Sequence, residues 1–281
     1  MDKQLFKSLE GFLITKNNKS ILAQAKSLTK PGSFLSEEQQ KNYFLAVQQY
    51  LDSINGNVSN YDKDNIEITK YSEPAVSNDV FYKYVSKKTL NKYIKNGIFK
   101  FGNLVHYQKA QNNKIKDEKE GHTHLIIESE DKQLLQSFYT GYNYLIFCGS
   151  YMPPNDPRSK YLKDNFGTCV IKIANTKSFR REIQKHLNIK SSLYRRIEYD
   201  EMKILKYNAN ASFTDTDPQI INDKTFDLIM KIISPSILFR KPIYYSEEYE
   251  LRFAFETQRD QKKPIILHNK GLLDYIEIME K

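Results

Sequence analysis

An acidic segment leads into an apolar strand at residues 241–255, which read Lys-Pro-Ile-Tyr-Tyr-Ser-Glu-Glu-Tyr-Glu-Leu-Arg-Phe-Ala-Phe. Glu248, Glu250 and Arg252 alternate where this strand is expected to begin, so we expect all three side chains on one face of it. Unpaired charges at the mouth of an apolar strand are costly. The pattern therefore predicts a site in which Arg252 orients one carboxylate and the other stabilises a cation or holds a hydroxyl. The alternative is a cross-strand ion pair that contributes little.

The chain from residue 76 to residue 281 is predicted to be one α+β domain with a mixed, mainly antiparallel sheet and flanking helices. Apolar runs and alternation predict strands at residues 80–85, 98–101, 122–128, 142–151, 167–173, 194–199, 202–207 and 250–256, the last of which is expected to close the chain. Helices are predicted at residues 89–96, 177–187 and 223–233. Regular alternation of strands and helices, which is typical of a doubly wound sheet, is absent.

Residues 1–75 are predicted to be a separate helical region. Apolar residues recur at helical spacing up to about residue 56, and Ser36-Glu37-Glu38-Gln39 is typical of a helix N-terminus. An Asn-, Asp- and Ser-rich stretch with one short strand at 66–71 then leads to Pro74. We place the domain boundary near residue 75.

The chain is basic, with 43 Lys and Arg against 34 Asp and Glu, a formal net charge of +9. Arginine, which binds phosphate in a bidentate manner, is sparse and occurs only at positions 158, 180, 181, 195, 196, 240, 252 and 259. Four of these lie in the stretch 177–206, which is the one basic concentration. This stretch predicts either a nucleic-acid or phosphate site or a solvated basic surface.

The sequence contains no Walker A, Rossmann or nucleophile-elbow motif. It is therefore not expected to be a P-loop NTPase, a Rossmann dehydrogenase or an α/β-hydrolase. Cys148 and Cys169 form no zinc pattern, and His122 with His124 lacks further ligands, so no metal is expected. The N-terminus lacks a signal peptide, and no apolar run reaches the length of about 18 residues that a membrane span needs. We therefore expect a cytoplasmic protein without membrane contact, with secretion as a bacterial effector without a cleaved signal left open.

Two further segments carry candidate ligand-binding residues. Tyr82 and Tyr84 share one face of the first strand of the main domain, with Lys83 between them, so their rings could stack on a flat ligand. Cys148-Gly-Ser150-Tyr151 places a hydroxyl and a phenol at the end of a strand, where glycine permits close approach of a ligand. Ordinary strand aromatics and a bulge are the alternatives.

In these residues the sequence resembles a bacterial domain family of unknown function. The resemblance covers about residues 80–256 and leaves out the helical N-terminus. It rests on Tyr82-Lys83-Tyr84, the helix and turn 89–97, the strand 98–101, the segments 144–150 and 166–170, and Lys241 followed by Glu-x-Glu-x-Arg. The family's Asn-Asp-Pro loop is replaced by Asp117-Glu-Lys-Glu-Gly.

More distantly, the layout resembles ADP-ribosyltransferases. That resemblance implies an ADP-ribosyltransferase-like fold with NAD as substrate. It implies that Glu250 is the catalytic carboxylate, that Glu248 faces the acceptor, and that Ser150 lies against the nicotinamide. Lys83 or Tyr84 would take the role of the first strand, where such enzymes generally have His or Arg.

Three functions follow as hypotheses. The first is an NAD-dependent ADP-ribosyltransferase acting as a toxin, effector or phage-defence factor, with Glu250, Glu248 and Arg252 as catalytic residues. Its acceptor would be a protein or a nucleic acid, and its NAD-binding residues are Tyr82, Lys83, Tyr84, Ser150 and Tyr151. The second is a nucleic-acid-binding or RNA-cleaving protein that uses the stretch 177–206. The third is a non-enzymatic interaction module.

Overall fold

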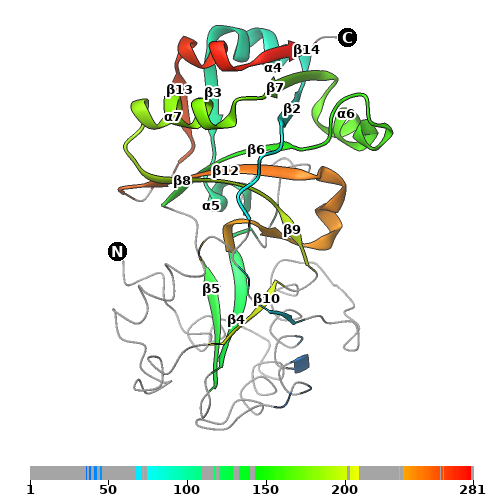
Figure 1. The fold of residues 1–281 in the computed structure, drawn as a ribbon, viewed down its shortest axis with the longest axis vertical. Coiled ribbons are helices and arrows are strands. Elements are labelled where there is room, and N and C mark those ends of the chain that lie inside the picture. Colours follow the sequence, from blue (N-terminus) through cyan, green and yellow to red (C-terminus); the bar gives the residue numbers. More distant parts are fainter. Residues whose placement is uncertain are drawn as a thin grey trace, which may run out of the picture. The chain divides into compact units, whose positions relative to one another are not determined.

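A computed structural model of the 281-residue chain shows a mixed α+β protein with a curled antiparallel sheet (Figure 1). It describes residues 75–108, 117, 120–128, 133–139, 143–200, 203–208, 237–259, 261 and 263–279, together with residues 36, 38, 41, 42, 45, 68–70, 72 and 234. The chain divides into two compact units. The first comprises Met1–Ser72, His122–Tyr139 and Asp200–Ser234, and the second comprises Glu73–Gly121, Thr140–Tyr199 and Pro235–Lys281.

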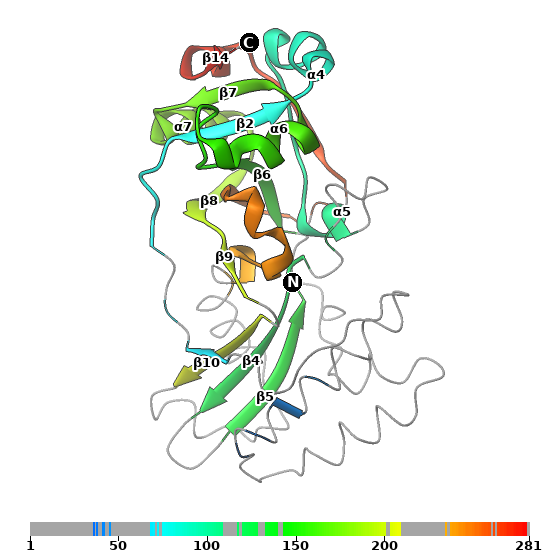
Figure 2. The ribbon, with the colours of Figure 1, turned by 90° about the vertical axis from the view of Figure 1, so that its right-hand side faces the viewer.

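The second unit is built on a six-stranded antiparallel sheet. In spatial order its strands are β14 (Glu277–Met279), β7 (Cys169–Ile173), β2 (Phe81–Val85), β6 (Tyr144–Ser150), β12 (Glu250–Thr257) and β8 (Ile189–Arg196). Strand β12 lies between β6 and β8 and pairs with both along its length. Strand β2 runs steeply across β6 in both views (Figures 1 and 2). The two strands pair at one position only, Tyr82 with Ser150.

One face of this sheet carries an aromatic core. Phe81, Phe147 and Phe253 come from three neighbouring strands, and their rings lie 4.9–6.3 Å apart. Helices α4 (Lys87–Lys92), η3 (Ile94–Asn96) and α7 (Thr176–His186) cover this face with buried apolar side chains. The strand pair β3 (Ile98–Phe101) and β13 (Ile265–His268) and the 3₁₀ helix η7 (Lys270–Tyr275) complete the cluster.

The other face of the sheet is covered by short elements. Helix α6 (Lys160–Phe166) follows the turn η4 (Pro157–Ser159) and packs Leu162 against Tyr84. Helix α5 (Leu104–Gln108) packs Leu104 in a cluster with Ile146 and Ala254. Near it lie the parallel pair β9 (Glu198–Tyr199) and β11 (Arg240–Lys241) and the 3₁₀ helix η6 (Ile243–Glu248).

The first unit contains a separate four-stranded sheet (Figure 2). Its order is β1 (Thr69–Lys70), β10 (Ile204–Asn208), β4 (His122–Glu128) and β5 (Gln133–Tyr139). Strands β1, β10 and β4 are parallel, and β5 pairs antiparallel with β4. Residues 122–139 and 200–234 thus belong to the first unit, although both fall within the expected domain 76–281. The strands described in these segments, β4, β5 and β10, pair within the four-stranded sheet.

Most predicted elements of the second unit are confirmed within one to five residues, and two expectations need correction. The predicted helix 89–96 is two elements, α4 and η3, ended by Gly97 in the left-handed region at φ 69°. Strand β12 does not close the chain, because β13, η7 and β14 follow it. The helices predicted within residues 1–56 lie almost entirely outside the described residues, and the helix 223–233 lies wholly outside them. In the part of the chain that is described, no helix has the length and apolar character to cross a membrane.

Candidate active site

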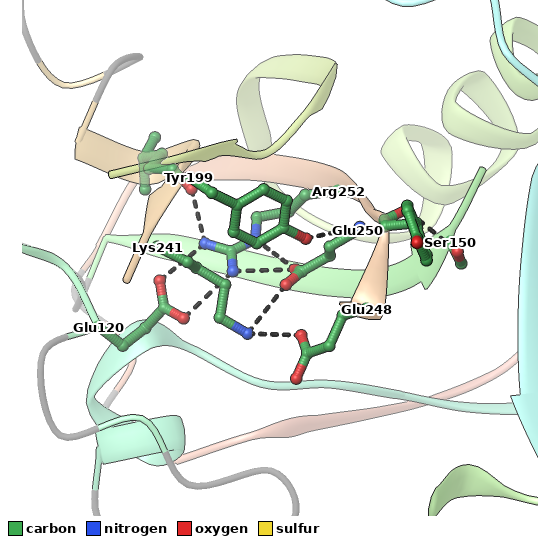
Figure 3. Close-up of polar contacts among 9 residues, drawn as sticks. Glu120, Ser150, Tyr199, Lys241, Glu248, Glu250 and Arg252 are labelled. Atoms are coloured by element: carbon green, nitrogen blue, oxygen red, sulfur yellow. Dashed lines mark hydrogen bonds and ion pairs between the residues drawn. The ribbon is translucent and has the colours of Figure 1, made fainter. Parts of the chain in front are cut away.

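The start of β12 carries a buried cluster of charges (Figure 3). Arg252 donates from Nε to Glu250 Oε1 at 2.9 Å, and its two other nitrogens donate to the carboxylate of Glu120 at 2.8 and 3.1 Å. It also donates to the Leu238 carbonyl at 2.6 Å. All three charged residues are at most 2% exposed. Arg252 is therefore a fixed bridge between two carboxylates.

Lys241 extends the cluster to a third carboxylate. Its Nζ donates to Glu250 Oε2 at 3.0 Å and to Glu248 Oε2 at 2.7 Å. Five side chains, three acidic and two basic, thus form a continuous chain from Glu120 to Glu248 (Figure 3). Burying so many charges costs folding free energy that apolar packing would not.

Glu248 does not lie on the strand, which corrects the expectation that it alternates with Glu250 and Arg252. It is the last residue of η6, and Tyr249 between the two glutamates takes a left-handed conformation at φ 45°. That turn redirects the chain, and the carboxylate still reaches the cluster through Lys241. Glu250 and Arg252 do share one face of β12, as alternation predicts.

The two glutamates have opposite pKa shifts. Burial raises the pKa of Glu248 to about 7, and the charge of Glu250 adds to this effect while Lys241 opposes it. For Glu250, burial is outweighed by Arg252 and Lys241, which hold its pKa well below its usual range. Glu248 can therefore exchange a proton near neutral pH, whereas Glu250 remains ionised. Such a divergence within one site separates an acid–base group from a permanent charge.

A split in the sheet opens beside this cluster. Strands β2 and β6 separate after the pair Tyr82–Ser150. Gly149 is required there, because a Cβ atom would lie 2.3 Å from the Phe81 ring and 2.6 Å from the Tyr82 carbonyl. Across the split, Lys83 Nζ donates to the Cys148 carbonyl at 2.5 Å. The Lys83 side chain thus bridges the two strands where their backbones are not paired.

The charge cluster and the split line a single cavity of about 270 Å³. Its lining residues include predicted site residues from β2, β6, η6 and β12, namely Tyr82, Lys83, Tyr84, Ser150, Glu248, Glu250 and Arg252. Leu162 and Phe166 of α6 form an apolar part of the cavity wall. One cavity therefore combines aromatic and apolar walls with two glutamates of opposite pKa shift.

Two predicted ligand-binding residues have other contacts. The Ser150 hydroxyl donates to the Tyr249 carbonyl at 3.0 Å and accepts from the Met152 N–H at 3.0 Å, so it fixes the turn before Glu250. Tyr151 does not line the cavity; its ring lies 4.1 Å from the Arg196 guanidinium.

Sequence reasoning missed several residues of the site. Glu120, Lys100, His106 and Tyr107 line the cavity, and Tyr199 accepts a hydrogen bond from the Glu250 N–H at 2.9 Å. Lys241 was part of the quoted motif but had no assigned role. Burial raises the pKa of Tyr107 and lowers that of His106. Glu120 also lay in a segment that the sequence had singled out, Asp117–Gly121, without a role assigned to it.

Some side chains of the basic stretch 177–206 pair with other groups of the protein, and several of them are also exposed to solvent. Arg196 forms two hydrogen bonds of 2.6 Å to Asp79, and Arg180 donates to the Ser192 carbonyl at 3.2 Å. Arg195 is 3% exposed, and Lys185 pairs with Glu182 at 2.8 Å. These contacts show that part of the stretch contributes to the packing of the second unit.

Among the described residues, no group of three or more His, Cys, Asp or Glu side chains is arranged to hold a metal ion. No protein-family model, curated protein or solved structure matches the chain.

Proposed function

We propose that the second unit is an ADP-ribosyltransferase-like domain that cleaves the bond between nicotinamide and ribose in NAD. The observation that carries the proposal is that Glu248, Glu250, Ser150, Tyr82 and Tyr84 line one cavity. Ligand pockets commonly start at about 300 Å³, so this cavity of about 270 Å³ takes the nicotinamide riboside end and leaves the rest of NAD outside.

The chemistry follows from the two glutamates. When the C–N bond breaks, its electron pair goes to the nicotinamide nitrogen and positive charge develops on the ribose. The ionised Glu250 stabilises that charge electrostatically. Arg252 and Lys241 position Glu250 and keep it ionised. Arg252, predicted as catalytic, is accordingly a positioning residue.

Glu248 takes the proton of the acceptor. As the acceptor oxygen or nitrogen bonds to C1 of the ribose, its proton passes to the Glu248 carboxylate, whose pKa of about 7 suits a base at neutral pH. The rings of Tyr82 and Tyr84 form the wall against which a flat nicotinamide ring lies. The Tyr84 hydroxyl donates to the Met152 carbonyl at 2.8 Å, and this hydrogen bond holds the Tyr84 ring in position. Such an activity suits a toxin, a bacterial effector or a phage-defence factor.

Release of nicotinamide from NAD by the purified chain tests this proposal. Glu250→Gln should lower the rate by about 10²- to 10³-fold, the usual cost of losing one electrostatic stabiliser. Glu248→Gln should lower it by about 10²-fold or more. Glu247→Gln is the matched control, because Glu247 is exposed and does not line the cavity. Equal nicotinamide release by Glu250→Gln and the wild type would rule out the role of Glu250. No release by the folded wild type would favour the non-enzymatic module.

A further inference from the structure

The positive charge of the chain is concentrated in one segment. Residues 80–116 contain nine lysines and neither Asp nor Glu. Since the whole chain has 43 Lys and Arg against 34 Asp and Glu, the remainder is balanced, with 34 of each. The stretch 177–206 also contains nine Lys and Arg, but four acidic residues accompany them. The segment 80–116 therefore accounts for the whole excess of +9, which corrects the expectation that 177–206 is the one basic concentration.

Six of these nine lysines lie in the described part of the chain. Lys83 and Lys100 line the cavity, and the other four are exposed on α4 and η3. Leu90 and Ile94, the apolar residues of these two helices, are buried in the core. The helices therefore turn their apolar side toward the sheet and carry their lysines on the solvent side. These four lysines are Lys87, Lys88, Lys92 and Lys95.

Lys270 extends this basic surface. It is exposed at the start of η7, and its backbone lies against Gly97, where an added Cβ atom would be 2.8 Å from Lys270 Cα. The Asn269 N–H donates to the Gly97 carbonyl at 2.8 Å, which fixes the start of η7 beside the end of η3. We define the lysine face as Lys87, Lys88, Lys92, Lys95 and Lys270.

The stability of α4 gives no reason for these charges. Ser86 caps the helix, so Lys87 and Lys88 occupy its first turn, where the helix dipole favours acidic residues. Lys88 and Lys92 are four residues apart, a spacing at which like charges on a helix repel. Within the described part of the chain, Lys87, Lys88 and Lys92 form no ion pair with a carboxylate. Negative charge on a bound partner would relieve this repulsion.

Tyr93 places an aromatic ring among the lysines. It is 41% exposed, and the Lys92 Nζ lies 5.3 Å from the centre of its ring. A ring that stacks on a base, combined with cations that hold phosphates, is the usual way in which proteins bind single strands. An anionic membrane is a poorer partner, because the apolar residues Leu90 and Ile94 face the core and cannot insert into lipid.

We propose that the lysine face and Tyr93 bind single-stranded nucleic acid. The lysines contact phosphates, and one base stacks on the Tyr93 ring. Lysine acts as a point charge and stacking accepts every base, so the binding has little sequence preference. Neither the lysine face nor Tyr93 lines the cavity. This inference therefore does not rest on the cleavage of NAD.

Fluorescence anisotropy of the full-length protein with a labelled 12-nucleotide DNA strand tests the proposal. The logarithm of the affinity should fall with the logarithm of the salt concentration at a slope of about −2 to −3.5, since three to five phosphate contacts contribute about 0.7 each. The variant Lys87→Gln, Lys88→Gln and Lys92→Gln should bind about 10²-fold more weakly at 50 mM salt, with a slope smaller by about 2.

Substitutions at Tyr93 test the stacked base. Tyr93→Ala should weaken binding of the single strand by about 5- to 150-fold and leave the salt slope unchanged. Tyr93→Phe keeps the ring and should bind as the wild type does. The same strand annealed to its complement is the second probe. Its affinity should not change in Tyr93→Ala, because paired bases are not free to stack on the ring.

A charge-matched variant separates the lysine face from the general basic charge of the protein. Lys160→Gln, Lys177→Gln and Lys263→Gln remove three exposed lysines outside the lysine face and should weaken binding by at most about threefold. Equal losses in the two triple variants, both checked for folding by circular dichroism, would overturn the proposal. So would an unchanged affinity for the single strand in Tyr93→Ala, or no binding by the wild type at 50 mM salt. These outcomes leave nicotinamide release unaffected, so the two proposals fail separately.

Discussion

The two faces of β12 are both buried, yet they are built from opposite kinds of residue. Leu251, Phe253 and Phe255 are fully buried on one face in the aromatic core. Glu250 and Arg252 are buried on the other face, beside the cavity. Apolar packing accounts for the first face, since burial of such side chains is the main source of stability. The second face costs folding free energy, so its charges indicate a functional role.

The aromatic face should show the largest effect on stability. The Phe253 ring lies 4.4 Å from that of Tyr194 and 4.9 Å from that of Phe81. Phe253→Ala removes these contacts and leaves a cavity, so we expect the free energy of unfolding to fall by about 3–5 kcal/mol. Urea denaturation measures this, with Ile266→Ala at a half-exposed site as control, expected to change it by about 0.5 kcal/mol or less. A fall in the free energy of unfolding of Phe253→Ala no larger than that of Ile266→Ala would contradict the claim that the aromatic face of β12 stabilises the fold.

On the charged face, removal of Arg252 alone should lower the stability, and removal of its two carboxylate partners as well should restore much of it. Arg252→Met leaves Glu120 and Glu250 buried without their shared partner, and we expect a loss of about 3–5 kcal/mol. The triple variant Glu120→Met, Glu250→Met and Arg252→Met removes the unpaired charges and should recover much of that loss. If the triple variant is less stable than Arg252→Met in urea denaturation, the charged cluster stabilises the fold. The contrast between the two faces of β12 would then be wrong.

The pH dependence of stability should reveal the raised pKa of Glu248. Its folded pKa of about 7 exceeds its ordinary value of 4.5, so the folded protein keeps a proton that the unfolded chain has lost between these values. The free energy of unfolding should therefore fall as the pH rises from about 4.5 to about 7, by up to about 3 kcal/mol. Glu248→Gln should remove this decline, and Glu247→Gln should retain it. Glu250, whose pKa is lowered, contributes stability that is lost only below its ordinary pKa.

Among these substitutions in the second unit, controls apart, the one at Lys83 is expected to have the smallest effect on the free energy of unfolding. Lys83→Met removes one hydrogen bond, to the Cys148 carbonyl, and leaves no carboxylate unpaired, so a loss of about 1 kcal/mol or less is expected. Lys241→Met is the matched comparison and should lose several times more, because two buried carboxylates lose their partner. Equal losses in thermal or urea unfolding would show that the two lysines do not differ as described.

Local periodicity was sufficient to predict much of the second unit and half of the site. The two-residue period of a strand placed Glu250 and Arg252 on one face correctly. It failed at Glu248, because nothing in Ser-Glu-Glu-Tyr-Glu indicates that Tyr249 adopts φ 45°. It could not find Glu120, whose contact with Arg252 joins residues 132 positions apart. Long-range pairing of this kind depends on the tertiary fold, and so does the separation of the two units.

The protonation of the two glutamates is the central claim, and carbon NMR measures it most directly. The side-chain carboxyl carbons of ¹³C-labelled glutamate are followed from pH 4 to pH 9, with the signals assigned by Glu248→Gln and Glu250→Gln. We expect the Glu248 signal to titrate near pH 7 and the Glu250 signal to remain that of an ionised carboxylate throughout. Titration of both signals near pH 4.5 would contradict the account.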